Sequence, residues 1–212
     1  MPSAEPPGSI EPPGGSVVGV ALAGGQSRRM GRDKTVLVVP GDPRTLLRST
    51  VDRLAEVCSE VLVADGGRRR LGDVPSVVDG PGRGPIAGVL GAAAARPGRD
   101  LLVLACDLPA VPRALLRLLV EARDHGAARV DAVVPVTERG LEPLCARYAP
   151  RCLDAFRARV AEGRFDLIGL LNAPPSPLRV ERVERPNGEL INLNRPTDVE
   201  TFAAMRHSIL RR

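Results

Sequence analysis

The chain has 212 residues, a formal net charge of +5 at pH 7 and a sequence pI near 9.6, so it is long enough for one α/β domain and suits an anionic partner. Hydrophobic residues make up 43% of the sequence and charged residues 26%, which is ordinary for a globular protein. Because there is no Trp, one Tyr and three Phe, the chain lacks the rings that stack single-stranded nucleic acid, and we expect no nucleic-acid partner.

Cysteine usage and hydropathy exclude further classes of protein. The four cysteines form no C-x-x-C pair and only two histidines are present, so a structural zinc site is not expected. No apolar stretch has the length needed to span a bilayer, and the N-terminus lacks the basic and then apolar run of a secretory signal. We therefore expect a reduced cytoplasmic protein that does not bind a membrane.

The first sixteen residues differ from the rest of the chain. They contain five prolines and three glycines with almost nothing to bury, so we expect a disordered leader over residues 1–16 and a folded domain over residues 17–212. From residue 17 on, short apolar runs alternate with amphipathic segments of helix length, as in β-α-β units with a mostly parallel sheet. The pattern predicts strands over 17–23, 61–63, 76–78 and 101–105, and helices over 47–58, 87–95 and 112–123.

The pattern changes after residue 131. The strand-like segments 132–136 and 142–148 are joined by a short polar turn, which predicts an antiparallel hairpin and therefore a mixed sheet. A helix over 150–162, a proline-rich loop over 173–177, strands near Val180 and Ile191 and a final helix from Pro196 complete the expected elements. The predicted fold class is thus α/β, with a mostly parallel, mixed sheet.

Four residues follow the ends of predicted strands, namely Gly24, Asp65, Asp79 and Asp107. In open α/β sheets the carboxyl ends of the strands form the edge at which ligands bind, so four such positions favour one common site. Each of them taken alone is equally typical of a turn, because glycine and aspartate are frequent turn formers.

The segment 22–34, with the sequence LAGGQSRRMGRDK, contains three glycines and four basic residues. Gly24 and Gly25 let the backbone approach a ligand closely, so that main-chain N–H groups can bind an anion while the basic side chains add positive charge. The segment is not a Walker A loop, because Lys34 lies three residues beyond Gly31 instead of directly after it. It predicts a phosphate-binding loop, with a solvated basic loop as the alternative.

The same segment resembles the signature loop L-A-G-G-x-S-x-R-M-G-x-D-K of the sugar-nucleotide and molybdenum-cofactor nucleotidyltransferases. Further motifs match in the same order along the chain: Asp79, Gly84-Pro-Ile-Ala-Gly88, Cys106-Asp-Leu-Pro109, Glu142-Pro-Leu and Asn192-Leu-Asn194. Their spacing is most similar to that of the molybdenum cofactor guanylyltransferases of the MobA-like family. The resemblance implies an enzyme with a single three-layer, Rossmann-like α/β nucleotidyltransferase domain.

The resemblance also implies roles for individual residues. Lys34, Arg28 and Asp107 are the expected catalytic residues, with Lys34 neutralising phosphate charge and Asp107 binding the Mg²⁺ cofactor. A helix cap before Pro112 is the alternative for Asp107. The expected GTP-binding residues are Leu22, Ala23, Gly24, Gly25, Lys34, Asp79, Gly84 and Asp107.

Asp79 matches the aspartate that reads the base in the family. An ionised carboxylate can accept hydrogen bonds from both N1–H and the N2 amino group of guanine, whereas cytosine has no comparable pair of donors, so GTP is favoured over CTP. Asn192 and Asn194 match a pair near the metal and the pterin phosphate, although asparagines before a helix are often caps. Ala64 stands where many relatives carry an asparagine, and either Asp65 takes over its contact or the contact is absent.

The implied reaction is attack by the terminal phosphate of molybdopterin on the α-phosphorus of GTP, which releases pyrophosphate and forms the guanine dinucleotide cofactor. No general base is required, because a phosphate nucleophile is ionised at neutral pH. Contacts to the pterin could come from Arg147, Arg164 or the loop at residue 173, and the resemblance allows transient contact with molybdenum-insertion proteins or target molybdoenzymes. The alternatives are a related cytidylyltransferase, a guanylyltransferase with another phosphorylated substrate, and a non-catalytic nucleotide-binding protein.

Overall fold

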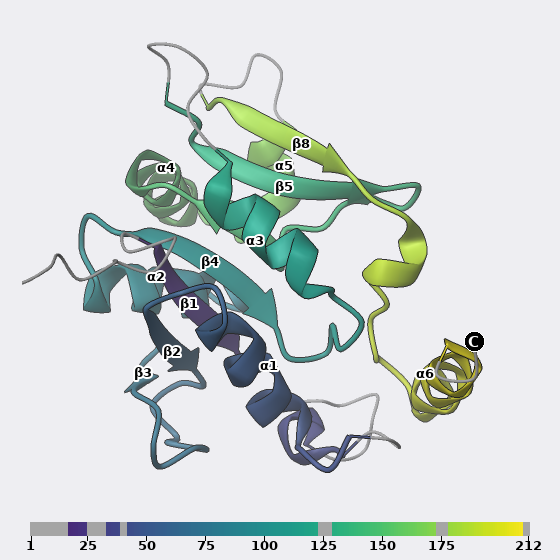
Figure 1. The fold of residues 1–212 in the computed structure, drawn as a ribbon. Helices are drawn as coiled ribbons and strands as arrows, with labels where there is room; N and C mark the ends of the chain where they lie inside the picture. The colour runs from purple at the N-terminus through teal and green to yellow at the C-terminus, as the bar shows by residue number, and fades with distance from the viewer. Residues whose placement is uncertain (1–16, 25–32, 39–41, 123–128, 173–177, 210–212) are drawn as a thin grey trace, which may run out of the picture.

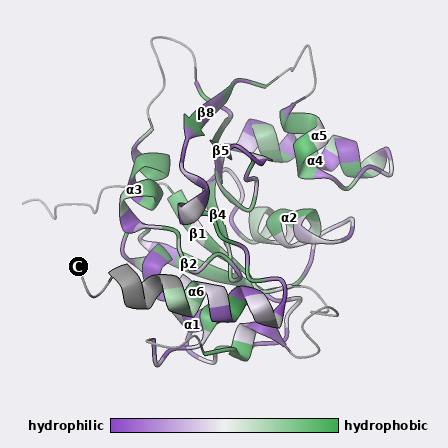
Figure 2. Cartoon of the chain, turned by 90° about the vertical axis from the view of Figure 1, so that its right-hand side faces the viewer, coloured by the Kyte–Doolittle hydropathy of each residue, from purple (hydrophilic) through white to green (hydrophobic). Residues whose placement is uncertain are grey.

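In the computed structural model, which describes residues 17–24, 33–38, 42–122, 129–172 and 178–209, an eight-stranded sheet lies between two layers of helices (Figure 1). Two helices pack on each face: α1 (Leu46–Ala55) and α3 (Arg113–Glu121) on one, α2 (Pro85–Ala95) and α4 (Pro150–Ala161) on the other. Hydrophobic strands lie at the centre of the molecule (Figure 2). The three-layer α/β class is therefore confirmed, while the expected leader and the loop over 173–177 lie outside the described residues.

Four parallel strands form one half of the sheet, in the order β3 (Ser76–Val77), β2 (Glu60–Ala64), β1 (Val17–Leu22) and β4 (Asp100–Ala105). Every residue of β1 and β4 is buried, because helices cover both faces of the sheet at these central strands. Their burial explains the uninterrupted apolar runs that predict both strands. The register aligns the strand ends, since Leu22 lies beside both Ala64 and Ala105.

The other half of the sheet is mixed and contains β5 (Ala132–Thr137), β6 (Gly140–Leu141), β7 (Cys145–Tyr148) and β8 (Val180–Glu184). β7 is antiparallel to β4 and β5, β6 is antiparallel to β5, and β8 is parallel to β5. The predicted strand over 142–148 is wrong for its first three residues. Pro143 has no N–H to donate, and Cys145 N donates to Glu142 O at 3.1 Å, so residues 142–145 form a turn before β7.

The segment between β8 and the last helix is irregular, so the strand predicted near Ile191 is wrong. After the 3-10 turn η2 (Asn187–Glu189) the chain passes the end of β4, where Leu193 N donates to Asp107 O at 2.9 Å. Leu190 and Leu193 are completely buried, so hydrophobic packing holds this segment instead of strand pairing. Two further helices are present: α5 (Leu167–Leu171), which the sequence pattern does not predict, and α6 (Pro196–Ile209), which it does.

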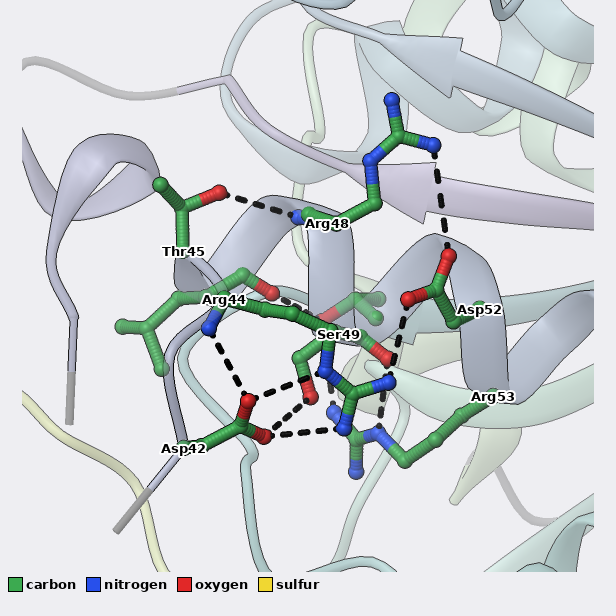
Figure 3. A network of polar contacts seen from close by, with 9 residues as sticks. Asp42, Arg44, Thr45, Arg48, Ser49, Asp52 and Arg53 are labelled. Carbon is green, nitrogen blue, oxygen red and sulfur yellow. Dashed lines mark hydrogen bonds and ion pairs between the residues drawn. The ribbon is translucent and has the colours of Figure 1, made fainter. Parts of the chain in front are cut away.

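A network of polar side chains fixes the start of α1 (Figure 3). Thr45 is the N-cap of α1, and its hydroxyl accepts a hydrogen bond from Arg48 N at 3.2 Å. Arg44 pairs with Asp42 at 2.9 Å in the loop before the helix and with Asp52 at 3.0 Å in the helix itself. Within the described residues, α1 and the other helices all lack the combination of length and apolar content that crossing a membrane requires.

Two glycines bring α2 close to the end of β3. A Cβ on Gly91 would lie 2.1 Å from Val78 O, and a Cβ on Gly80 would lie 2.8 Å from Gly91 N, so neither position accepts a side chain. Gly80 N also donates to Ala87 O of α2 at 2.8 Å. Because Asp79 lies between Val78 and Gly80, these contacts fix Asp79 in front of α2.

Candidate active site

A cavity of about 490 Å³ opens at the carboxyl ends of β1, β2 and β4. Seven residues predicted from the sequence line it, namely Leu22, Ala23, Gly24, Lys34, Asp79, Gly84 and Asp107. Gly25 and Arg28, also predicted, lie outside the described residues. The cavity therefore occupies the edge at which open α/β sheets bind ligands, and three of the four predicted strand-end residues meet there.

Lys34 joins two segments that are far apart in the sequence. It is the first residue of the 3-10 turn η1 (Lys34–Val36), whose N-cap is Asp33. Its Nζ donates to Asp107 Oδ2 at 3.1 Å and to Asn194 Oδ1 at 2.8 Å. The side chains of Lys34 and Asp107 are 14% and 20% exposed, so their ion pair is partly shielded from water. One cation, one carboxylate and one amide thus converge at the cavity.

The loop that carries Asp107 is held by two other segments. Leu193 N donates to Asp107 O at 2.9 Å. Arg53 of α1, labelled in Figure 3, donates through Nη1 to Leu108 O at 3.1 Å and to Val111 O at 3.2 Å. Burial lowers the pKa of Arg53 to about 10, which leaves the guanidinium protonated at neutral pH. Helix α1 and the segment before α6 therefore both fix the position of Asp107.

Two simpler roles are excluded for the loop that carries Asp107, namely a helix cap and a thiol nucleophile. The N-cap of α3 is Pro112, and the carboxylate of Asp107 bonds to Lys34 instead of capping that helix. The neighbouring Cys106 lines the cavity, but burial raises the pKa of its thiol to about 12, so the thiol stays protonated at neutral pH and is no nucleophile. The cavity offers charged and polar groups without a covalent catalyst in this loop.

The first turn of α2 and the end of β1 form one wall of the cavity. Gly84, the N-cap of α2, has φ of 69° and ψ of −155°, a conformation that essentially only glycine adopts. A Cβ on Gly88 would lie 3.2 Å from Leu22 Cδ2 and 3.3 Å from Ala64 Cβ, so glycine keeps this wall thin. Oδ1 of Asp79 lies 3.9 Å from the same point. The carboxylate of Asp79 thus stands beside an apolar surface.

Asp65 does not take over a contact in the cavity from position 64. Its side chain is completely buried and accepts hydrogen bonds from Arg68 N at 3.1 Å, from Arg70 N at 2.9 Å and from Ser76 Oγ. It therefore organises its own loop, and Ala64 itself lines the cavity. Arg68 also lines the cavity although no motif marks it, and the run of three arginines after the strand is the signal that could have indicated it.

A second cavity, of about 430 Å³, contains both predicted asparagines and is lined by Arg139, Glu142, Asn192, Asn194, Arg195 and Asp198. Asn194 connects the two cavities, because its side chain accepts a hydrogen bond from Lys34. The backbone N–H of Asn194 donates to Asp198 Oδ2 at 2.7 Å, so Asp198 fixes the loop before α6. The side-chain amide of Asn194 is thereby held where it contacts Lys34. Burial raises the pKa of Glu142, and the charge of Arg139 opposes this shift.

The two arginines suggested for a pterin line neither of these cavities. Arg147 pairs at 3.3 Å with Asp100, which begins β4 and so lies at the opposite end of that strand from Asp107. Arg164 pairs with Glu162 directly after α4. The basic residues of the second cavity belong instead to the turn after β5 and to the loop before α6.

Known proteins share both the sequence pattern and the length of this chain. Residues 19–172 match the MobA-like NTP transferase domain. The chain is 32% identical to a probable molybdenum cofactor guanylyltransferase of Chloroflexus aggregans, over 88% of this chain and 93% of that protein. It is 36% identical to a probable molybdenum cofactor guanylyltransferase of Opitutus terrae, over 86% of this chain and 93% of that protein.

Solved structures share the fold. Molybdopterin-guanine dinucleotide biosynthesis protein A from Archaeoglobus fulgidus has a TM-score of 0.70 and 22% identity, covering 90% of this chain and 99% of that one. A 2-C-methyl-D-erythritol 4-phosphate cytidylyltransferase from Thermus thermophilus has a TM-score of 0.64 and 20% identity, covering 89% of this chain and 98% of that one. With its ordered motifs and its strand-end cavity, the chain belongs to the MobA-like NTP transferase family and is a nucleotidyltransferase.

Proposed function

We propose that this nucleotidyltransferase transfers GMP from GTP to the terminal phosphate of molybdopterin. A phosphate oxygen of molybdopterin attacks the α-phosphorus of GTP, the bond from that phosphorus to its bridging oxygen breaks, and pyrophosphate leaves. The observation that carries the proposal is the contact of Lys34 with Asp107 and Asn194, at the junction of two polar cavities. Relatives named as molybdenum cofactor guanylyltransferases support it.

Lys34 and Asp107 suit the phosphates of the nucleotide. The ammonium of Lys34 is a point charge on a flexible stem, so it can exchange its present partners for phosphate oxygens. The carboxylate of Asp107 and the side-chain amide oxygen of Asn194 are hard oxygen ligands that fit Mg²⁺. The chemistry that Mg²⁺ supplies when bound is neutralisation of the charge that develops on the phosphates.

Asp79 and the thin wall beside it suit the guanine ring. The carboxylate can accept hydrogen bonds from N1–H and the N2 amino group together, while Gly88 keeps the neighbouring surface free of a side chain. Cytosine offers no comparable pair of donors. The arrangement therefore favours GTP over CTP. Because a cytidylyltransferase shares the fold, the fold alone does not select the base, and we assign that selection to Asp79.

The second cavity suits the acceptor phosphate. Arg139 and Arg195 supply positive charge, and the amides of Asn192 and Asn194 can donate to phosphate oxygens. Because Asn194 also bonds to Lys34, an acceptor phosphate bound here would lie near a nucleotide held by Lys34. The protein then contributes positioning and charge neutralisation, without a covalent intermediate.

Pyrophosphate release with molybdopterin and each of the four nucleoside triphosphates, measured with and without Mg²⁺, tests the reaction and the base choice together. We expect release from GTP only, and only when Mg²⁺ and molybdopterin are both present. Equal release from CTP would contradict the assignment of Asp79, and release from GTP without molybdopterin would contradict the acceptor. No release from any of the four would overturn the proposal.

A further inference from the structure

The loop between β2 and β3 contacts the segment that carries Lys34, and Arg70 makes the contact. Arg70 Nη1 donates to Thr35 Oγ1 at 2.9 Å and also to the carboxylate of Asp33. The Arg70 side chain is 18% exposed and that of Asp33 is 37% exposed, so the contact is partly shielded from water on the arginine side. It joins the end of β2 to η1 across 37 positions of sequence.

Asp33 connects Arg70 to Lys34. Its Oδ1 accepts from Thr35 N at 3.0 Å and from Thr35 Oγ1 at 2.7 Å, and its Oδ2 accepts from Arg70. Burial raises the pKa of Asp33, but the hydrogen bonds from Thr35 and Arg70 together outweigh burial and lower the pKa below its usual 3.8, so the carboxylate is ionised at neutral pH. Because Asp33 is the N-cap of η1 and Lys34 follows it directly, this cap sets the direction in which the lysine leaves the backbone.

Arg70 is itself fixed by a buried carboxylate. Asp65 Oδ2 accepts a hydrogen bond from Arg70 N at 2.9 Å, and Ser76 of β3 donates to the other oxygen. Asp65 is completely buried, so these bonds are shielded from water. An unbroken series of contacts thus runs from the end of β2 through Asp65, Arg70 and Asp33 to Lys34.

We propose that Arg70 is a positioning residue that acts through Asp33 and holds η1 so that Lys34 Nζ reaches Asp107 and Asn194. The end of β2, where Ala64 offers no polar side chain, then serves the site by supporting the phosphate-binding lysine instead of contacting the nucleotide. The inference rests on the proposed function in one respect, which is that Lys34 binds the phosphates of GTP.

Titration calorimetry of the full chain with GTP and Mg²⁺ tests this role in Arg70→Met, Asp33→Asn and the double variant. A displaced Lys34 should weaken GTP binding by about tenfold in each single variant. Since the two residues act through one contact, the double variant should bind GTP within about twofold of either single variant. Guanosine has no phosphates, so its affinity should be the same in all variants and in the wild type.

Arg48→Met is the matched control, because Arg48 pairs with the same loop through Asp73 instead of Asp33. It should bind GTP within about twofold of the wild type. Wild-type GTP affinity in Arg70→Met, losses that multiply in the double variant, or an equal loss of guanosine binding would each overturn the proposal.

Two further results distinguish a wrong role for Arg70 from a variant that fails to fold and from a wrong proposed function. If Arg70→Met does not fold, Asp33→Asn decides the question, because asparagine is also a good N-cap but carries no charge for Arg70. Wild-type GTP affinity in Asp33→Asn would then overturn the role of Arg70. A wild-type chain that binds no GTP would overturn the proposed function, and this inference with it.

Discussion

The two cavities belong to two halves of the sheet and are built in different ways. The first stands at the ends of parallel strands, where the register places Leu22 beside Ala64 and Ala105, and these three residues line one space. The second is formed where the chain leaves the sheet, at the break over 142–144 and in the irregular segment before α6. Strand pairing therefore positions the first cavity, whereas side-chain packing and single hydrogen bonds position the second.

This difference leads to an expectation that substitutions can test. Changes in the parallel half should act on the nucleotide, and changes in the mixed half should act on the acceptor. Residues at the junction should affect both substrates.

Asp107→Asn should have the largest effect, because Asp107 lies at the junction and bonds to Lys34. Loss of the proposed Mg²⁺ ligand should lower kcat for pyrophosphate release by about 10²–10³, or roughly 3–4 kcal/mol. The rate should be measured at saturating GTP over a series of Mg²⁺ concentrations, with Asp52→Asn on the surface of α1 as the control. A wild-type rate in Asp107→Asn would remove Asp107 from the site.

Gly91→Ala should destabilise the parallel half. The added Cβ would lie 2.1 Å from Val78 O, and this backbone overlap should lower the free energy of unfolding by about 3 kcal/mol. Because Asp79 follows Val78, the KM for GTP should rise as well, while the KM for molybdopterin should not. Urea unfolding is the measurement, and Gly72→Ala, with nothing within 4 Å of its Cβ, is the control. Unchanged stability would contradict the packing of α2 on the end of β3.

Asp79→Asn should affect the nucleotide alone. The amide can accept only one of the two guanine donors well, so kcat/KM for GTP should fall by about thirtyfold, or about 2 kcal/mol. ITP lacks the N2 amino group, so its kcat/KM should fall less than that of GTP. The kcat/KM values of the two nucleotides should therefore be closer in the variant than in the wild type. If the variant kept the wild-type preference for GTP over ITP, Asp79 would not read the base.

Glu142→Gln should have the smallest effect and should act in the mixed half. Burial raises the pKa of Glu142 in the folded chain, so its ionisation opposes folding once the pH rises above the usual value of 4.5. The variant should therefore gain a few tenths of a kcal/mol in unfolding free energy at neutral pH, since solvent screens a half-buried group, and nothing near pH 3. Its KM for molybdopterin should fall, because the substitution removes a negative charge from the cavity proposed for the acceptor phosphate, while the KM for GTP stays constant. If Glu142→Gln had a lower free energy of unfolding than the wild type at neutral pH, the ionised Glu142 would stabilise the fold instead of opposing it.

Much of the fold was predictable because the evidence for it lies between neighbours in the sequence. The apolar runs that become β1 and β4 are continuous, since both strands are buried on both faces. The break before β7 was not predictable, because it is a turn at which the chain passes from β6, which pairs with β5, to β7, which also pairs with β4. Near Ile191 the apolar pattern indicates a strand, whereas burial of Leu190 and Leu193 holds the chain without strand pairing.

The sequence by itself determined the fold class, the family and the strand-end positions of Gly24, Asp79 and Asp107, because motif spacing and periodicity are local properties. Only the tertiary structure decided which of these groups touch. Lys34 and Asn194 are 160 residues apart and bond through a side chain of each. The inward turn of Asp65 and the contact of Arg70 with Asp33 likewise depend on how loops pack, and no periodicity along the chain records that packing.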